Sequence, residues 1–259
     1  MSEIQDELKR DVLRNMLSQG RRADGRGNHD YRAIKIVKNP LQNAEGSALC
    51  MLGKTQVLCG VKVDMAVPFS DRPDEGVLST GAEFTPLGSH TFEPGPPSRG
   101  AIELARVVDR GIRSSETIDL KALAIEGMEK VQAIYIDLWI LDHDGNLFDA
   151  SMLAAMAALQ GTRMPKIEDK KLIRTETSGM LNPKVPVVSC TFGKVDERIL
   201  LDPTMDEQKG LDGQFTIATT PDHVCAVQKS GWAAFPQKDI LDLVGLSFSK
   251  AAELRRALE

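Results

Sequence analysis

Arginines recur at helical spacing between residues 98 and 119, in the segment SRGAIELARVVDRGIRSSETID. On a helix with 3.6 residues per turn they share one side of the cylinder: Arg99, Arg106, Arg110 and Arg113. Each guanidinium presents a fork of N–H donors, so such a stripe can bind successive phosphates of a nucleic-acid backbone. Periodicity alone favours a simpler interpretation, a solvated face on which Glu103 and Asp109 pair with the arginines.

The element that must position these arginines is an amphipathic helix. Its opposite side is apolar: Ala101, Leu104, Ala105, Val108 and Ile112. Ser98 can cap the first turn, because its hydroxyl oxygen can accept a hydrogen bond from a free backbone N–H. We therefore expect a helix that buries its apolar side and keeps its arginines at the surface.

Length and composition limit what the rest of the chain can be. At 259 residues it can form one large domain or two smaller ones, each with a core. A formal net charge of -5 means that any nucleic-acid site must be a local basic patch. Aromatic residues make up only 5% of the chain, which argues against single-strand binding mainly by base stacking.

The spacing of the cysteines indicates whether a metal site is present, and the length of the apolar runs indicates whether the chain spans a membrane. Cys50, Cys59, Cys190 and Cys225 form no C-x-x-C pair and have no histidine at metal-ligand spacing. We therefore expect buried free thiols, no metal site and no cofactor. No apolar run approaches the roughly 20 residues that span a bilayer, and the N-terminal segment is charged and helix-patterned. We expect a cytoplasmic protein of a reducing compartment that makes no contact with a membrane.

The remaining elements alternate between strands and helices. Further helices are expected at Ile4–Leu17, at Leu147–Leu159 and from Pro236 to Leu254. Strands are expected at Tyr31–Val37, in a hairpin at Gly46–Met65, in a short strand near Glu83, and at Val131–Leu141, Val187–Phe192, Arg198–Leu201, Phe215–Thr219 and Val224–Gln228. Residues 67–97 are expected to form a long loop, and residues 161–186 a junction between two halves.

This order predicts an α+β fold of two halves, each made of strands closed by helices. The N-terminal helix and a basic turn occupy residues 1–30. The first domain is expected at residues 31–165 and the second at residues 187–259.

Two short motifs suggest ligand sites but lack essential positions. The triplet GKT at residues 53–55 resembles the end of a P-loop, yet Ala48 replaces the leading glycine and a strand follows. The run DHDG at residues 142–145 resembles the start of a calcium-binding loop, but Leu153 stands where that loop needs its glutamate. We interpret the first as a hairpin turn and the second as a strand-to-helix turn.

Several stretches taken together resemble the ribonuclease PH family. EGSALCMLGKTQVLC at residues 45–59 resembles the family's first hairpin, and GAEFTPL at residues 81–87 its next strand. GAIELARVVDRGIR followed by DLKAL, within residues 100–123, resembles its central helix. The N-terminal helix, the RRADGR turn and the DPT at residues 202–204 are most similar to the ribonuclease PH-like ring subunits of the archaeal exosome.

The resemblance implies a ribonuclease PH-like fold and a six-membered ring in which this chain alternates with a related catalytic subunit. Active members degrade RNA from its 3′ end with inorganic phosphate as nucleophile, and one of the two archaeal subunits lacks activity. RNA and RNA-binding cap proteins are further implied partners. In this setting the stripe is expected to contribute Arg106, Arg110 and Arg113 to a shared RNA groove, whereas Arg99 lies too near the long loop to be included.

The chain departs from the family pattern at the turn that binds phosphate. Active members bind the phosphate with the arginine of a G-G-T-R-T-A-S-type turn. The matching segment is GNLFDAS at residues 145–151, which puts Phe148 where that arginine would be and Asp149 beside it. A phenyl ring offers no donor and a carboxylate repels phosphate. The resemblance therefore implies a non-catalytic subunit, without catalytic residues of its own.

The chain can also be compared with the family at a pair of aspartates. Active members carry a D-x-x-x-x-x-D arrangement after a strand that ends in Leu-Asp. Asp206 and Asp212 have this separation if the loop is shortened by two residues, whereas ungapped alignments reach Gln208 and Gly213. We prefer to interpret the two acids as turn residues. The alternative is an active phosphate-dependent 3′ exoribonuclease that uses them, and a third possibility is a purely structural ring member.

Overall fold

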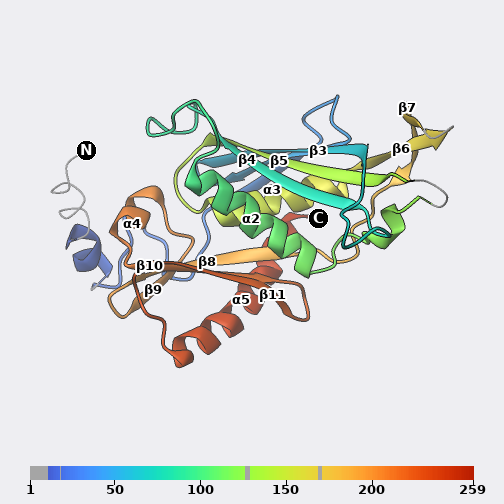
Figure 1. Ribbon diagram of the computed structural model, residues 1–259. Coiled ribbons are helices and arrows are strands. Elements are labelled where there is room, and N and C mark those ends of the chain that lie inside the picture. The colour runs from blue at the N-terminus through green and yellow to red at the C-terminus, as the bar shows by residue number, and fades with distance from the viewer. Residues whose placement is uncertain (1–10, 18, 126–128, 169–170) are drawn as a thin grey trace.

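Sheets and helices alternate in layers in the computed structural model, which describes residues 11–17, 19–125, 129–168 and 171–259. A five-stranded sheet is followed by helices α2 (Arg99–Ser114) and α3 (Leu147–Gln160), then by a four-stranded sheet, and then by α5 (Gln237–Ala257) (Figure 1). The expected α+β arrangement of strands closed by helices is confirmed.

The first sheet contains the predicted N-terminal hairpin. Its strands, in spatial order, are β1 (Ile34–Lys38), β2 (Gly46–Leu52), β3 (Thr55–Ala66), β5 (Val131–Asp142) and β4 (Val77–Phe84). Residues 53 and 54 form the turn between β2 and β3, so the GKT triplet is a hairpin turn, as predicted. Among the strands in the described ranges, β4 and β5 are the one pair that runs parallel, because α2 lies in the connection between them.

The second sheet is antiparallel throughout. Its strands, in spatial order, are β11 (Val224–Gly231), β10 (Gly213–Thr219), β8 (Val188–Val195) and β9 (Arg198–Leu201). The short helix α4 (Met205–Gly210) lies in the connection from β9 to β10. The predicted last helix, α5, begins one residue later than expected, because Pro236 is its N-cap residue.

The position of helix α3 between the two sheets accounts for its apolar composition. It packs against β2 and β3 on one side and β8 on the other, so residues 149–159 are all buried. An Ala- and Met-rich helix that is apolar nearly all round is expected where both sides face protein. Val57 of the first sheet, Met152 of α3 and Phe192 of the second sheet belong to one hydrophobic cluster. The two halves of the chain therefore share a core.

Two segments are more regular than predicted. The strand near Glu83 is the full-length β4, and the junction at residues 161–186 contains a hairpin of β6 (Arg163–Glu168) and β7 (Lys171–Met180). Most of β7 is exposed, so its sequence lacks the apolar alternation on which strand prediction depends. Of the predicted N-terminal helix, residues 11–17 are helical, and residues 4–10 lie outside the described residues.

The thiols are mostly as expected. Cys50, Cys59 and Cys190 are buried, but Cys225 is half-buried, because β11 is an edge strand. Within the ranges given above, no group of His, Cys, Asp and Glu side chains could hold a metal ion. None of the helices in those ranges is both long enough and apolar enough to cross a membrane.

Candidate nucleic-acid interface

Helix α2 has the predicted cap and the predicted buried side. The Ser98 hydroxyl oxygen accepts a hydrogen bond of 3.2 Å from the backbone N–H of Ala101. Every residue of the predicted apolar stripe is buried, and Val107 is buried with them. The packing of this side against β4, α3 and β11 leaves the arginine side facing outward.

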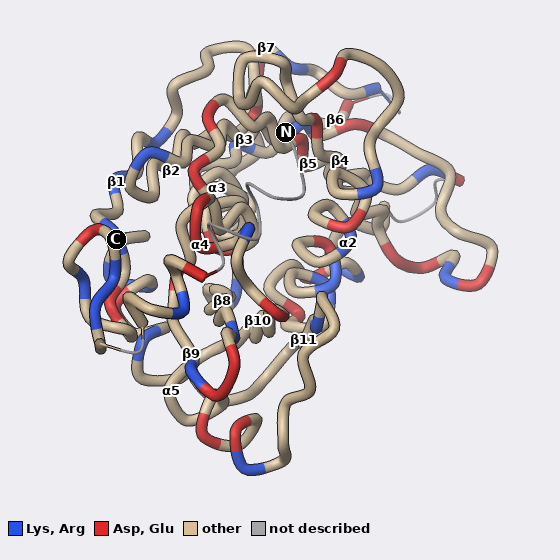
Figure 2. The backbone as a smooth tube through the Cα atoms, turned by 90° about the vertical axis from the view of Figure 1, so that its left-hand side faces the viewer, with Lys and Arg blue, Asp and Glu red and all other residues tan. Residues whose placement is uncertain are grey.

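The structure brings the three expected arginines together at one place. Arg106, Arg110 and Arg113 line a recess of about 350 Å³ beside Leu78–Thr80 of β4. Basic positions recur along α2, with acidic ones between them (Figure 2). Arg106 and Arg110 are exposed. The carboxylate of Asp109 also lines the recess, so three cations and one anion leave a net positive charge there, which attracts phosphate groups. Arg99, at the start of α2, does not line this recess.

Arg113 has a different environment from the other two. Its Nε donates a hydrogen bond of 3.1 Å to Oδ2 of Asp109, and its Nη2 donates one of 3.0 Å to the carbonyl oxygen of Leu78. The hydroxyl group of Thr80 also donates to Asp109, at 3.3 Å. Arg113 therefore ties α2 to β4, and Asp109 compensates its charge. The predicted pairing between the arginines and nearby acids is present here, at i,i+4 spacing.

The turn before α3 is the segment that was compared above with the phosphate-binding turn of active family members, and two of its residues determine its shape. Gly145 has φ +89°, and a Cβ there would lie 2.4 Å from the carbonyl oxygen of Pro203, so a side chain does not fit. Asn146 is the N-cap residue of α3, and its Oδ1 accepts from the backbone N–H of Asp149 at 3.4 Å. Its Nδ2 donates to Oδ2 of Asp149 at 2.9 Å and to Oδ1 of Asp202 at 2.7 Å. Two carboxylates therefore meet at the start of this helix.

The carboxylate of Asp149 is fully buried and accepts several hydrogen bonds. Besides Asn146, its donors are the hydroxyl of Tyr31 at 3.0 Å, the hydroxyl of Ser189 at 2.9 Å, and the backbone N–H and hydroxyl of Thr191 at 2.9 and 2.8 Å. Burial raises the pKa of Asp149 to about 6 and outweighs the donors that favour the charged form. This residue joins the segment before β1, the start of α3 and strand β8.

The carboxylate of Asp202 is a second buried junction. Arg32 donates to it from its backbone N–H and Nε, both at 2.9 Å, and from Nη2 at 2.7 Å, and Arg26 donates from Nη1 at 2.9 Å. Burial alone would raise the pKa of Asp202, but the hydrogen bonds and charge of Arg32 outweigh it, so the pKa lies below its usual value. Both carboxylates are thus held by donors of this chain.

The basic turn RRADGR has a structural role that sequence analysis did not assign. Arg22 is buried, and its Nε and Nη2 donate to the two carboxylate oxygens of Glu207 at 2.9 and 2.6 Å. Its Nη1 and Nη2 also donate to the carbonyl oxygens of Leu201 and Asp202. Arg22 therefore connects the N-terminal segment to the end of β9, to the residue that follows it and to α4.

These contacts leave no phosphate cradle of the expected kind at α3. A helix N-terminus commonly binds anions, but here Asp149 and Asp202 already accept hydrogen bonds from Asn146. Phe148 packs against the hydrophobic core. The segment at residues 145–151 contains no lysine or arginine.

The two acids of the alternative interpretation lie in unlike surroundings. Asp206 is exposed in the first turn of α4. Asp212 is buried, accepts a hydrogen bond of 2.8 Å from the backbone N–H of Asp196, and lies 3.5 Å from Nη2 of Arg14. Asp212 therefore holds the turn between β8 and β9 against the N-terminal helix.

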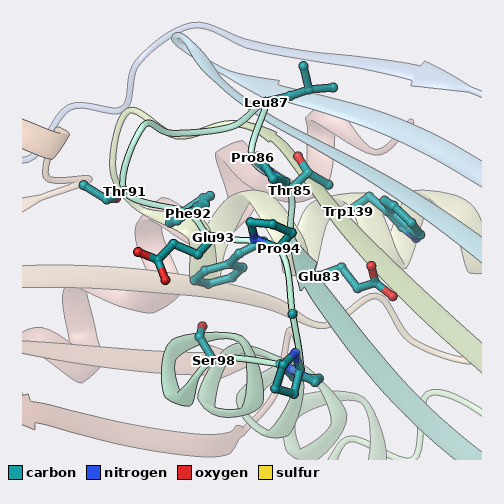
Figure 3. A pocket seen from close by; sticks show the side chains of 14 residues that line it. Glu83, Thr85, Pro86, Leu87, Thr91, Phe92, Glu93, Pro94, Ser98 and Trp139 are labelled. Atoms are coloured by element: carbon teal, nitrogen blue, oxygen red, sulfur yellow. The ribbon is translucent and has the colours of Figure 1, made fainter.

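A larger groove, of about 850 Å³, lies between β4, β5 and the loop that leads into α2 (Figure 3). Half of the residues that line it are prolines or aromatics, and Trp139 lies opposite Glu83 across the β4–β5 pair. The charged side chains of the lining are Glu83 and Glu93, which repel phosphate. The arginine recess, and not this groove, has the chemistry of a nucleic-acid site.

Comparison with known proteins covers the whole chain. Two models of a 3′ exoribonuclease family match, the first domain at residues 30–165 and the second at residues 186–250. The chain is 44% identical to the exosome complex component Rrp42 of Thermococcus gammatolerans, over 99% of this chain and 96% of that protein. It is 43% identical to the component of the same name from Methanosarcina acetivorans, over 98% of this chain and 95% of that protein.

Solved structures agree with the sequence relatives. A chain of a structure described as the Archaeoglobus fulgidus exosome with RNA bound to the active site superposes with a TM-score of 0.92, at 44% identity over 99% of this chain and 100% of that one. A chain of an archaeal exosome core superposes with a TM-score of 0.88, at 41% identity over 98% of each. The expected ribonuclease PH-like fold is confirmed, and the protein belongs to the ribonuclease PH family of 3′ exoribonucleases and their relatives.

Proposed function

We propose that this chain is a non-catalytic ring subunit of an archaeal exosome, a complex that degrades RNA from its 3′ end. In this role it scaffolds the active site of a catalytic ribonuclease PH-like partner and helps to bind RNA. The observation that carries the proposal is the start of α3, where Phe148 and two buried carboxylates stand in place of a phosphate-binding arginine. Phosphorolysis needs that anion held beside the scissile bond, because two negative groups must approach each other.

The arginine recess supports the RNA-binding part of the role. Arg106 and Arg110 are exposed on one side of α2, one helical turn apart, and can contact successive phosphates. Arg113 lines the same recess as a third, weaker contact, because Asp109 already compensates its charge. These contacts carry no information about RNA sequence, so binding should be sequence-independent.

Assembly is the second part of the role. The relatives are named as exosome components, and two matching structures are of archaeal exosomes. We propose that the chain alternates with the catalytic subunit in a six-membered ring, that RNA-binding cap proteins join the ring, and that the complex is cytoplasmic. Trp139 and Leu87 at the groove of Figure 3 are 42% and 87% exposed, and large exposed apolar side chains are typical of subunit interfaces.

The competing function is an active exoribonuclease that uses Asp206 and Asp212. The contacts of Asp212 with Asp196 and Arg14 favour a structural role for it instead. A decisive experiment measures phosphate- and magnesium-dependent release of nucleoside diphosphates from labelled RNA by this chain alone and by the chain with its catalytic partner. The proposal predicts release by the mixture only. Release by the chain alone, abolished by Asp206→Asn, would establish the competing function.

A second experiment tests assembly. Light scattering should report a complex of several subunits when this chain and its catalytic partner are mixed. A monomer whose mass is unchanged by the partner would contradict the ring.

A further inference from the structure

We propose that Gln228, on β11, is a positioning residue of the RNA-binding face: it holds the carboxylate of Glu103 away from Arg106 and orients Arg110. This inference rests on the proposed function, because it concerns how the arginine recess is kept positively charged. Gln228 belongs to the second sheet, whereas the arginines belong to α2. The charge of the recess would then depend on both halves of the chain.

The two ends of the Gln228 amide contact opposite charges on α2. Its Nε2 donates a hydrogen bond of 2.9 Å to Oε1 of Glu103, and its Oε1 accepts one of 3.4 Å from Nη1 of Arg110. A carboxylate can only accept and a guanidinium can only donate, so a single orientation of the amide satisfies both neighbours. Gln228 is half-buried, which limits the freedom of its side chain.

The hydrogen bond between Gln228 and Glu103 matters because Glu103 is close enough to Arg106 on the helix to pair with it. Glu103 precedes Arg106 by three positions, and acids and arginines at that spacing on a helix commonly pair. Within the described ranges, the side chain of Arg106 nevertheless has neither an ion pair nor a hydrogen bond. Glu103 is instead bound to Gln228.

The same helix contains the opposite case. Asp109 has no amide from β11 bound to it, and it pairs with Arg113 at 3.1 Å. Arg113 is thereby compensated, whereas Arg106 and Arg110 remain exposed cations. Loss of the Gln228 side chain would therefore release Glu103 to pair with Arg106. The charge of Arg106 would then be neutralised by Glu103, as that of Arg113 already is by Asp109.

The test uses the assembled complex of this chain with its catalytic partner and a labelled oligoadenylate as the probe. Gln228→Ala should weaken RNA binding about three- to tenfold, because an arginine is diverted from phosphate. It should also lower the slope of log affinity against log salt by up to about 0.7, which is the value for one phosphate contact to a single strand. Gln214→Ala, on the neighbouring strand β10, is the matched control and should change neither quantity.

The double variant Glu103→Gln/Gln228→Ala separates positioning from a general structural effect. The double variant lacks the Glu103 carboxylate that Gln228→Ala would free to pair with Arg106, so affinity and salt slope should recover most of the loss. If Gln228→Ala has no effect while Arg106→Ala weakens binding, the inference is wrong and the proposed function stands. A loss in Gln228→Ala that Glu103→Gln fails to restore also overturns the inference. If Arg106→Ala and Arg110→Ala both leave binding unchanged, the RNA-binding role itself is wrong.

Discussion

The hydroxyl group of Tyr31 donates a hydrogen bond of 3.0 Å to the fully buried carboxylate of Asp149, 118 residues further along the chain. The segment before β1 is thereby attached to the first turn of α3, beside strand β8. A buried carboxylate with several donors is stable only while those donors remain in place. Asp149 thus has a structural role, and it directly follows Phe148, the residue that the sequence comparison matched to the phosphate-binding arginine of active family members.

At pH 7, where the difference no longer changes with pH, Asp149→Asn should lower the free energy of unfolding by about 2–4 kcal/mol. An amide has one acceptor oxygen, and its NH₂ group would face donors such as the backbone N–H of Thr191. Urea unfolding followed by circular dichroism measures the change. Asp222→Asn, in the exposed turn between β10 and β11, is the control and should cost less than about 0.5 kcal/mol. Equal stability of the two variants would show that the donors around Asp149 contribute little.

The same residue should make stability depend on pH. Burial raises the pKa of Asp149 from 3.8 to about 6, so between these values the folded state holds a proton that the unfolded state has released. The contribution of Asp149 to stability should therefore fall as pH rises from about 4 to about 6, by up to about 3 kcal/mol, and then stay constant. The measurement is the difference in unfolding free energy between the original protein and Asp149→Asn across this range. A difference that is independent of pH would contradict the raised pKa.

Arg32→Met should be strongly destabilising, by about 3–5 kcal/mol, because it leaves Asp202 buried without its main partner. Arg32 lowers the pKa of Asp202, so the stability from this pair is present above the unfolded value of 3.8 and is lost as pH falls further. The variant should lose that dependence at acid pH. Adding Asp202→Asn to Arg32→Met should recover part of the loss, whereas additive losses would argue against coupling.

Much of the site's framework was predictable, because it is local. The apolar period of α2 and the cap at Ser98 are contained in one segment, and both are confirmed. The roles of Asp149 and Asp202 were not, because their donors come from residues far away in the sequence, such as Tyr31 and Arg32. An aspartate that will be buried cannot be distinguished in the sequence from one that will be solvated. The two differ only in the tertiary packing, which for Asp149 brings together the segment of Tyr31, α3 and β8.

Gln228 was missed for the same reason. Nothing around it in β11 differs from any exposed strand, and its contacts with Glu103 and Arg110 depend on how the second sheet packs against α2. The hairpin of β6 and β7 was missed for another reason, since an exposed, charged hairpin carries no apolar alternation.

Phe148→Arg alone should not make the isolated chain an exoribonuclease. The new guanidinium would lie beside Asp149. Asp206 would still be exposed in α4, and Asp212 would still be buried and bound to the backbone of Asp196. Release of nucleoside diphosphates from labelled RNA in phosphate buffer is the readout, with the catalytic partner as positive control. Phosphate-dependent release by the single variant would show that Phe148 is the only barrier to activity.

Replacing each arginine of the α2 recess with alanine in the assembled complex should mainly affect RNA binding for Arg106 and Arg110, and mainly affect stability for Arg113. Arg106 and Arg110 are exposed, so their loss should weaken binding of all RNA sequences similarly and lower the salt slope by roughly 0.7 each. RNA turnover by the partner should fall as well, because a poorly held 3′ end is poorly positioned for attack. Arg113→Ala should instead cost about 1 kcal/mol of stability and change the slope less, since its Nε and Nη2 already bind Asp109 and Leu78. The measurements are a salt titration of RNA affinity and a thermal unfolding curve for each variant. Equal slopes in all three variants and in the original complex would make the stripe a solvated face and leave the subunit with a scaffolding role alone.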